Sequence, residues 1–72
     1  MPKFYNKNGT LTDYALSCGY VETRPTSFNG EKRLSKSHGV YHVIARNDEN
    51  GVYVMQSFHR LTNARKLFNA VK

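Results

Sequence analysis

Apolar and polar residues alternate along two stretches of the chain, residues 40–46 and 52–58, as they do in strands that bury one face. Between the two stretches, Asp48-Glu49-Asn50-Gly51 supplies the residue types that turns prefer. The pattern therefore predicts a β-hairpin made of central strands. One face of its first strand is expected to carry Tyr41, Val43 and Ala45, and the other face His42, Ile44 and Arg46.

A helical pattern follows the hairpin directly. Its apolar residues recur at helical spacing, which predicts a buried stripe and a polar outer face. No acidic residue follows Glu49, so the charged residues of that outer face are all basic. The expected stripe is Leu61, Ala64, Phe68 and Val71 with Leu67 beside them, and the expected outer face is Asn63, Arg65, Lys66, Asn69 and Lys72.

A shorter helix is predicted near the N-terminus. After an extended Phe4-Tyr5 and an Asn-Gly turn, Thr10 is expected to open this helix, with Asp13 three residues later as a weak capping box. Gly19 provides a natural C-terminal stop. The helical stripe is expected to be Leu11, Tyr14, Ala15 and Cys18, which makes Cys18 a small core residue.

The stretch from residue 20 to residue 37 has few apolar residues, but Asn29-Gly30 divides it into two arms of similar length. We interpret it as a second hairpin, with arms Tyr20–Phe28 and Glu31–Ser37, and a long irregular loop is the alternative. Pro25 lacks an amide donor and belongs on a sheet edge or at a bulge. In the second arm, Lys32, Leu34 and Lys36 are expected on one face.

These elements predict an α+β fold in a single domain, residues 1–72. The expected order is αββββα: a small antiparallel sheet of three to four strands with an N-terminal and a C-terminal helix, both on one face. A chain of 72 residues has a thin core and little room for a catalytic cleft.

The chain has 11 Lys and Arg against 5 Asp and Glu, a net charge of +6. This excess favours polyanions or an acidic protein surface as partner, although a charge of this size is also ordinary for solubility. Cys18 is the only cysteine, which indicates a reducing cytoplasm, and we find neither a signal peptide nor an apolar run long enough to span a membrane.

No catalytic constellation is recognisable, so we expect a protein that is not an enzyme. Three histidines, His38, His42 and His59, lack the close spacing of metal ligands, even with Cys18 as a third ligand. We therefore expect surface histidines and neither metal nor cofactor.

Basic residues form two groups, one on the second hairpin and one on or beside the last helix. If both groups share a face, they make a stripe able to contact several phosphates; otherwise they are a solvated surface. Tyr41 and Tyr53 are either exposed platforms for stacking bases or the rim of a thin core. The candidate nucleic-acid-binding residues are Arg24, Lys32, Arg33, Lys36, Arg46, Arg65 and Lys66.

Residues 40–71, and in particular the run from Ser57-Phe58 through Ala64 to Phe68, resemble the small N-terminal DNA-binding module of tyrosine recombinases of phages and conjugative elements. The resemblance implies a three-stranded sheet laid in the DNA major groove with a helix packed behind it, and DNA as a more probable ligand than RNA. Arg60 stands where that family has a capping residue, and the helix at residues 10–18 has no counterpart there. The strand positions that the resemblance assigns to DNA contacts are Tyr41, His42, Ile44, Arg46, Tyr53 and Gln56.

The element order is also the outline of a double-stranded RNA-binding domain. The opening of the chain, from Phe4 to Leu16, resembles small accessory proteins of tailed phages, which implies the host cytoplasm as location. Many such proteins bind a host or defence protein. The alternative function is therefore a protein–protein inhibitor or adaptor that docks on an acidic or strand-edge surface, with a homodimer as a further possibility.

Overall fold

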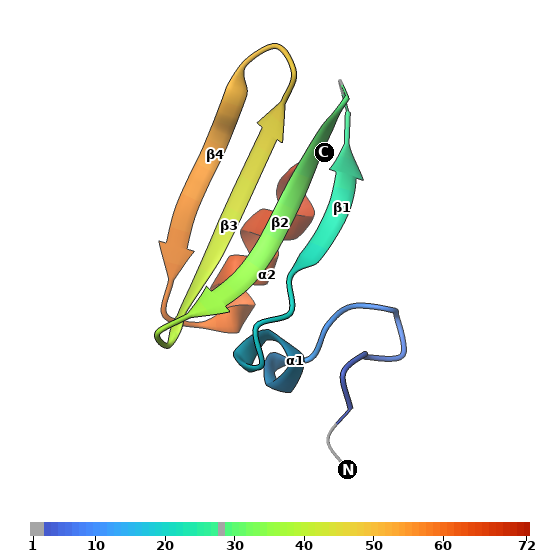
Figure 1. Cartoon of the computed structure of the whole chain (residues 1–72), viewed down its shortest axis with the longest axis vertical. Helices are drawn as coiled ribbons and strands as arrows, with labels where there is room; N and C mark the ends of the chain where they lie inside the picture. Colours follow the sequence, from blue (N-terminus) through green and yellow to red (C-terminus); the bar gives the residue numbers. More distant parts are fainter. Residues whose placement is uncertain (1–2, 28) are drawn as a thin grey trace.

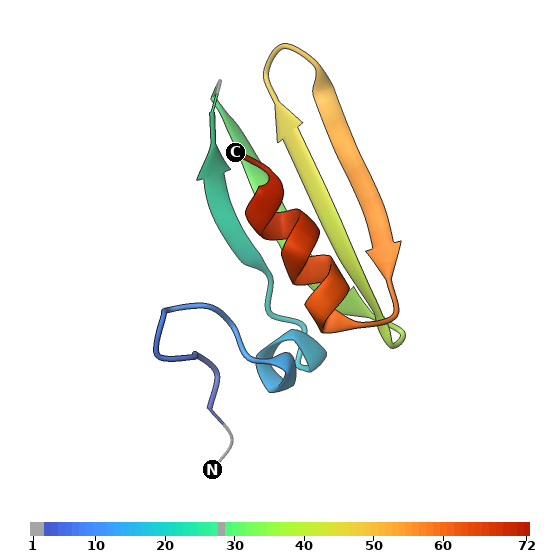
Figure 2. The ribbon, with the colours of Figure 1, turned by 180° about the vertical axis from the view of Figure 1, so that it is seen from behind.

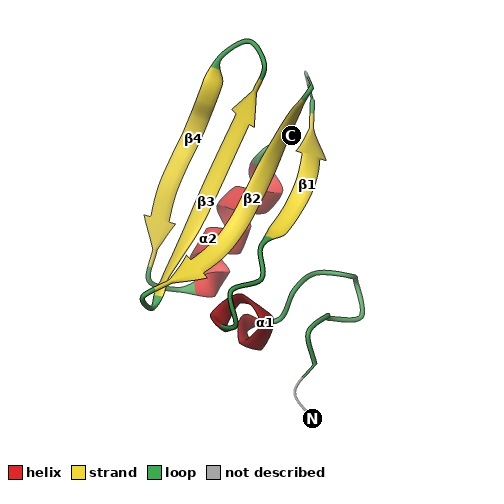
Figure 3. Cartoon of the chain, in the orientation of Figure 1, coloured by secondary structure: helices red, strands yellow, loops and turns green. Residues whose placement is uncertain are grey.

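The computed structural model describes residues 3–27 and 29–72. A four-stranded antiparallel sheet, with strand order β1-β2-β3-β4, carries a longer C-terminal helix on one face, and a short N-terminal helix lies at one end of the sheet (Figures 1 and 3). The predicted α+β class and the order αββββα are thereby confirmed. The elements are α1 (Asp13–Ser17), β1 (Glu22–Thr26), β2 (Gly30–Ser37), β3 (Val40–Asn47), β4 (Gly51–Phe58) and α2 (Leu61–Ala70).

Tight turns join the strands where the sequence has turn-forming residues. His38 and Gly39 connect β2 to β3, and both have positive φ (53° and 75°), as the type of turn that suits a two-residue hairpin requires. Residues 48–50 connect β3 to β4, so the predicted hairpin is confirmed. Pro25 lies in β1, at the edge of the sheet, as expected.

Helix α2 covers one face of the sheet, which Figure 2 shows from the helix side. Its Ala64 and Phe68 are buried against Leu34 of β2 and Val43 of β3. Tyr41, Val43 and Ala45 share one face as predicted, because alternate residues of a strand point to the same side, and the structure shows that this face is the buried one. We call this face of the sheet, together with α2, the α2 side.

The opposite face of the sheet has no helix on it (Figure 1). We call it the open face. The strand registers and the alternation of side chains place on it Thr23, Pro25, Glu31, Arg33, Ser35, His42, Ile44, Arg46, Tyr53, Met55 and Ser57.

Helix α1 differs from its prediction at both ends. It begins at Asp13, and its N-cap is Thr12, whose hydroxyl accepts a hydrogen bond from the Ala15 amide at 3.2 Å. Thr10 does not open the helix, because its hydroxyl bonds Asn8 at 2.6 Å within the preceding turn. Cys18 is the exposed C-cap, so its prediction as a core residue is wrong, as Leu16 fills the core position.

The second hairpin has its turn one residue earlier than predicted. Asn29 has the left-handed conformation (φ 58°), and Gly30 already belongs to β2, where it pairs with Thr26 and Asn47. Phe28, the predicted end of the first arm, lies outside the described residues. A Cβ atom on Gly30 would clash with the Arg46 carbonyl oxygen and lie 2.6 Å from Thr26 Oγ1, so only glycine fits between the strands.

We expect Gly30→Ala to lower the free energy of unfolding by about 1 to 3 kcal/mol, because the added methyl forces β1 and β3 apart from β2. Urea denaturation monitored by circular dichroism measures this loss. Asn29→Gly is the control, since it relieves a left-handed residue in the same turn and should change stability by under about 1 kcal/mol. Equal stability of Gly30→Ala and the wild type would contradict the close approach.

Candidate functional site

Five of the seven predicted nucleic-acid-binding residues lie on the α2 side. Arg24 of β1 pairs with Lys32 of β2, and Glu22 pairs with the buried Leu34, so these residues all point toward α2. The two basic groups of the sequence therefore share one side of the molecule, except for Arg33 of the second hairpin. The α2 side holds Arg24, Lys32, Lys36, Arg65 and Lys66, and the open face holds Arg33 and Arg46.

Lys32 is occupied at the C-terminal end of α2. Its Nζ donates hydrogen bonds to the carbonyl oxygens of Phe68 (2.7 Å) and Val71 (2.8 Å). The same Nζ lies 4.7 Å from the centre of the Phe68 ring. The last turn of α2 contains no basic residue, so Lys32 supplies the cation that carbonyls at a helix C-terminus favour.

Lys36 is occupied beside α1. Its Nζ donates to Asp13 (3.3 Å) and Ser17 (3.0 Å) and lies 5.0 Å from the centre of the Tyr41 ring. The Tyr41 hydroxyl donates to Asp13 at 2.6 Å, and this hydrogen bond, with help from Lys36, lowers the pKa of Asp13 despite some desolvation. Tyr41 is 6% exposed, so its prediction as a possible stacking platform is wrong, because the ring closes the core.

Arg65 forms a buried ion pair that the sequence did not predict. Its Nη1 and Nη2 donate to both carboxylate oxygens of Glu22 (2.9 and 3.2 Å), and Nη2 also donates to the Leu11 carbonyl oxygen (3.2 Å). The expectation that Arg65 faces solvent is wrong, since the long side chain reaches from α2 to β1. Glu22 precedes Arg65 by 43 residues, so no local pattern announces the pair.

The charge of Glu22 is stabilised in spite of its burial. Desolvation alone raises the pKa of its carboxyl, but the hydrogen bonds from Arg65 and from the Leu11 amide (2.7 Å), together with the positive charges of Arg65 and Arg24, bring that pKa below its usual range. Glu22 is thus ionised in the folded protein at neutral pH.

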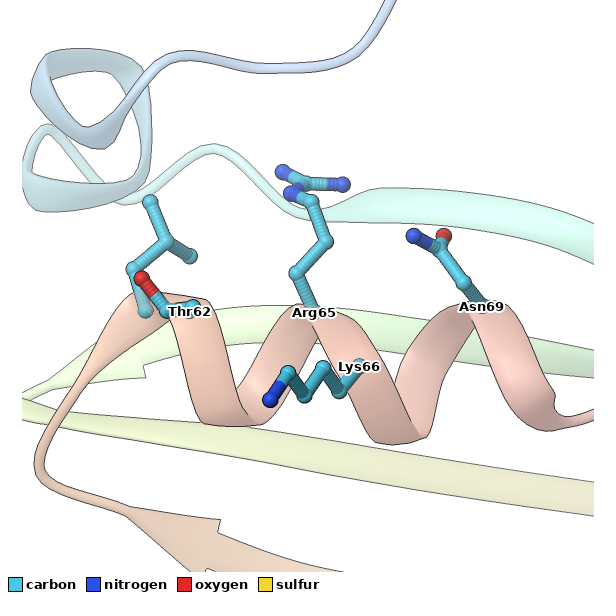
Figure 4. Close-up of a pocket in the computed structure, with 5 residues that line it drawn as sticks. Thr62, Arg65, Lys66 and Asn69 are labelled. Carbon is cyan, nitrogen blue, oxygen red and sulfur yellow. The ribbon is translucent and has the colours of Figure 1, made fainter.

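Arg24 and Lys66 are the two predicted residues of the α2 side that remain exposed and make no salt bridge within the described residues. Arg24 donates to the carbonyl oxygens of Thr23 (3.3 Å) and Gly9 (3.0 Å), and Lys66 lies on the outer surface of α2. Figure 4 shows Thr62, Arg65 and Asn69 extending from one flank of α2 toward β1, with Lys66 beside them.

These α2 side chains line a groove of about 380 Å³ along the helix (Figure 4). Its lining combines two cations with a hydroxyl and an amide, the groups that donate to anionic oxygens. The residues that line the groove are Leu61, Thr62, Arg65, Lys66 and Asn69.

The open face has less free positive charge. Arg33 and Arg46 both contact Glu31 Oε1, at 2.8 and 3.4 Å, so one acid serves two arginines. His42 shares a 2.9 Å hydrogen bond with Ser57 across β3 and β4. The DNA contacts implied by the resemblance are divided between the faces: Tyr41 and Gln56 point to the α2 side, and His42, Ile44, Arg46 and Tyr53 to the open face.

An exposed aromatic cluster at the N-terminal end escaped the sequence interpretation. The Phe4 ring centre lies 5.5 Å from that of Tyr14 and 5.1 Å from that of Tyr20. Edge-on and tilted contacts of this kind attach the N-terminal segment to α1 and to the residues before β1. Neither Phe4 nor Tyr20 belongs to a periodic apolar pattern, so this packing could not be predicted from local sequence.

Among the described residues, no three His, Cys, Asp or Glu side chains gather as a metal ion would require. Neither α1 nor α2 has the length and apolar character needed to cross a lipid bilayer. Comparisons of the chain with protein-family models, with curated proteins and with solved structures return no match.

We expect Arg65→Met to lower the free energy of unfolding at neutral pH by about 3 to 5 kcal/mol, because it leaves the Glu22 carboxylate buried without its partner. Lys66→Met is the matched control: the same charge is lost one residue along α2, from an exposed position, and the change should stay within about 0.5 kcal/mol. Urea denaturation of the three proteins measures both effects.

The difference in the free energy of unfolding between Arg65→Met and the wild type should become smaller in acid. In the wild type the folded-state pKa of Glu22 is depressed, so its contribution to stability is complete above the pKa of an unfolded glutamate and is lost as pH falls through the lowered folded-state pKa. In the variant, burial without Arg65 raises that pKa, so protonation relieves the penalty. A difference that is independent of pH would contradict the role assigned to the pair.

Proposed function

We propose that this protein is a non-enzymatic nucleic-acid-binding protein that contacts the sugar-phosphate backbone with its α2 side. The observation that carries the proposal is the gathering of basic side chains from β1, β2 and α2 on that side. Its acids, Asp13 and Glu22, are each paired with a cation, which leaves the exposed charge of Arg24 and Lys66 uncompensated. Phosphates are the partners that such a surface favours.

The basic residues of the α2 side divide into two kinds. Lys32, Lys36 and Arg65 bind helix carbonyls or carboxylates and thereby hold the helices on the sheet. Arg24 and Lys66 are exposed and are the residues we assign to phosphate contacts. Arg60 and Lys72, at the two ends of α2, are exposed as well and extend the positive surface along the helix.

The groove along α2 gives the phosphates neutral donors in addition to charge. The hydroxyl of Thr62 and the amide of Asn69 flank Arg65 on the side of α2 that faces β1 (Figure 4). Contacts of this kind fix the position of a nucleic-acid backbone and carry no sequence information. We therefore expect binding without sequence preference, with dissociation constants of about 10⁻⁴ to 10⁻⁶ M at physiological salt.

Fluorescence anisotropy with labelled single- and double-stranded DNA and RNA, over a salt series from about 50 to 200 mM, tests this proposal. The affinity should fall steeply with salt. Lys66→Gln and Arg24→Gln should each weaken binding to every sequence and reduce the slope of log K against log salt by about 1.

Arg46→Gln is the matched control, because it removes one positive charge from the open face, where Arg46 is 62% exposed. It should leave the salt slope nearly unchanged. An equal loss in all three variants would mean that net charge rather than the α2 side attracts the nucleic acid, and a larger loss for Arg46→Gln would favour the open face.

Binding that is undetectable with DNA and RNA, or insensitive to salt, would overturn the proposal. Retention of a partner from nuclease-treated lysate would then favour the rival function, an inhibitor or adaptor that binds another protein.

A further inference from the structure

The two edges of the sheet differ in how well they are protected. β1 has five residues and contains Pro25 together with the charged Glu22 and Arg24, which are features that prevent a strand from pairing with another chain. β4 has eight residues and contains neither proline nor any charged residue, and its pairing with β3 is irregular at one place, where Ala45 pairs with Val54 and Arg46 with Val52. β4 is therefore the edge of this sheet at which an additional strand can pair.

Three apolar side chains of β4 are exposed. Met55 is 68% exposed, Val52 50% and Tyr53 42%. Figures 1 and 2 show none of the described helices and strands outside β4, since α1 lies toward the β1 side of the sheet and α2 lies on one face of it. The backbone edge and its apolar side chains are therefore open to a partner along the strand.

Charges of opposite sign stand at the two ends of β4. Asp48 and Glu49 lie in the turn before the strand, and His59 and Arg60 follow it. All four residues are exposed, and within residues 3–27 and 29–72 neither Asp48 nor Glu49 takes part in a salt bridge. A second strand of the same sequence running antiparallel places acid beside base at both ends, whereas a parallel one places like charges together.

We propose that β4 pairs antiparallel with β4 of a second copy of this chain, so that the two sheets join into one continuous eight-stranded sheet. In an antiparallel pair, residues opposite each other share a face. This condition is met in the register that places Val54 of one copy opposite Val54 of the other, at the two-fold axis. Tyr53 then lies opposite Met55 of the second copy, in a favourable sulfur–aromatic contact that is made twice.

The same register brings the charged ends together. Asp48 lies toward Arg60 of the second copy, and Glu49 toward His59 of the second copy. The overall charge of +6 opposes association of two chains, but the strand itself is neutral and its ends attract. The pairing also covers the most exposed apolar side chains of the sheet, Met55 and Val52.

Sedimentation equilibrium of the 72-residue chain over a concentration series tests the dimer, which should have twice the mass of the 8.3 kDa chain. Two double variants test its geometry. Asp48→Lys with Glu49→Lys makes both ends of β4 basic, and His59→Glu with Arg60→Glu makes both ends acidic. Each should associate at least about tenfold more weakly than the wild type, because like charges then meet at the strand ends.

Mixing the two double variants in equal amounts should restore the dimer, now with one chain of each kind, since every strand end again meets its opposite charge. Lys66→Glu is the control; it changes the same kind of charge on α2, away from β4, and should dimerise like the wild type. Circular dichroism of each variant confirms that its fold is retained.

Met55→Lys is a separate variant that does not depend on the turn, and it should also abolish association, because it places a charge beside Tyr53 of the second copy. A wild-type chain that is monomeric at every concentration would overturn the proposal. A dimer that persists in Met55→Lys would also overturn it, and so would a mixture of the two double variants that fails to dimerise. In either case a surface or strand other than β4 would form the dimer interface.

The result of the dimerisation experiments is independent of nucleic-acid binding. The proposed dimer leaves Arg24 and Lys66 exposed, so the anisotropy experiment can succeed with a monomer and fail with a dimer.

Discussion

The buried ion pair between Glu22 and Arg65 joins three parts of the chain that would otherwise have little to hold them. Glu22 begins the edge strand β1, Arg65 lies in the last helix, and both bind Leu11 in the segment before α1. A short edge strand and a helix of five residues are weak elements on their own. Because ionised groups are rarely buried without partners, the three hydrogen-bonded groups have to assemble together.

The basic residues of this protein serve two purposes that composition cannot separate. Lys32, Lys36 and Arg65 each bind a specific oxygen partner between elements, and the Nζ atoms of Lys32 and Lys36 also lie over the core rings of Phe68 and Tyr41. A thin core gains stability from such side chains because it cannot bury enough apolar area alone. The positive charge left for a partner is therefore smaller than the net charge of the chain indicates.

Local patterns predicted the strands, their facing residues and the turns, since strand alternation and turn chemistry are properties of neighbouring residues. Tyr41, Val43 and Ala45 lie on one buried face for that reason, and the burial of Ala64 and Phe68 follows from helical spacing.

The same local reasoning failed where a residue distant in the sequence determines the position of a side chain. Arg65 was expected to face solvent, because its partner Glu22 lies 43 residues away in the sequence. Cys18 fell outside the core because α1 ends at Ser17 and Leu16 fills the buried position. Which side each basic residue occupies also depends on α2 covering one face, which periodicity alone does not specify.

The sheet order follows the order of the chain, so every strand pairs with its neighbour in sequence. Contacts between near neighbours lose little loop entropy, and topologies rich in them fold rapidly. A nascent chain is able to form β1 through β4 one hairpin at a time as it leaves the ribosome. The helix that covers this sheet follows all four strands in the chain. Until α2 has been made, the carboxylate of Glu22 has no cation and Leu34 and Val43 have no cover, so the sheet becomes stable only after α2 has packed on it.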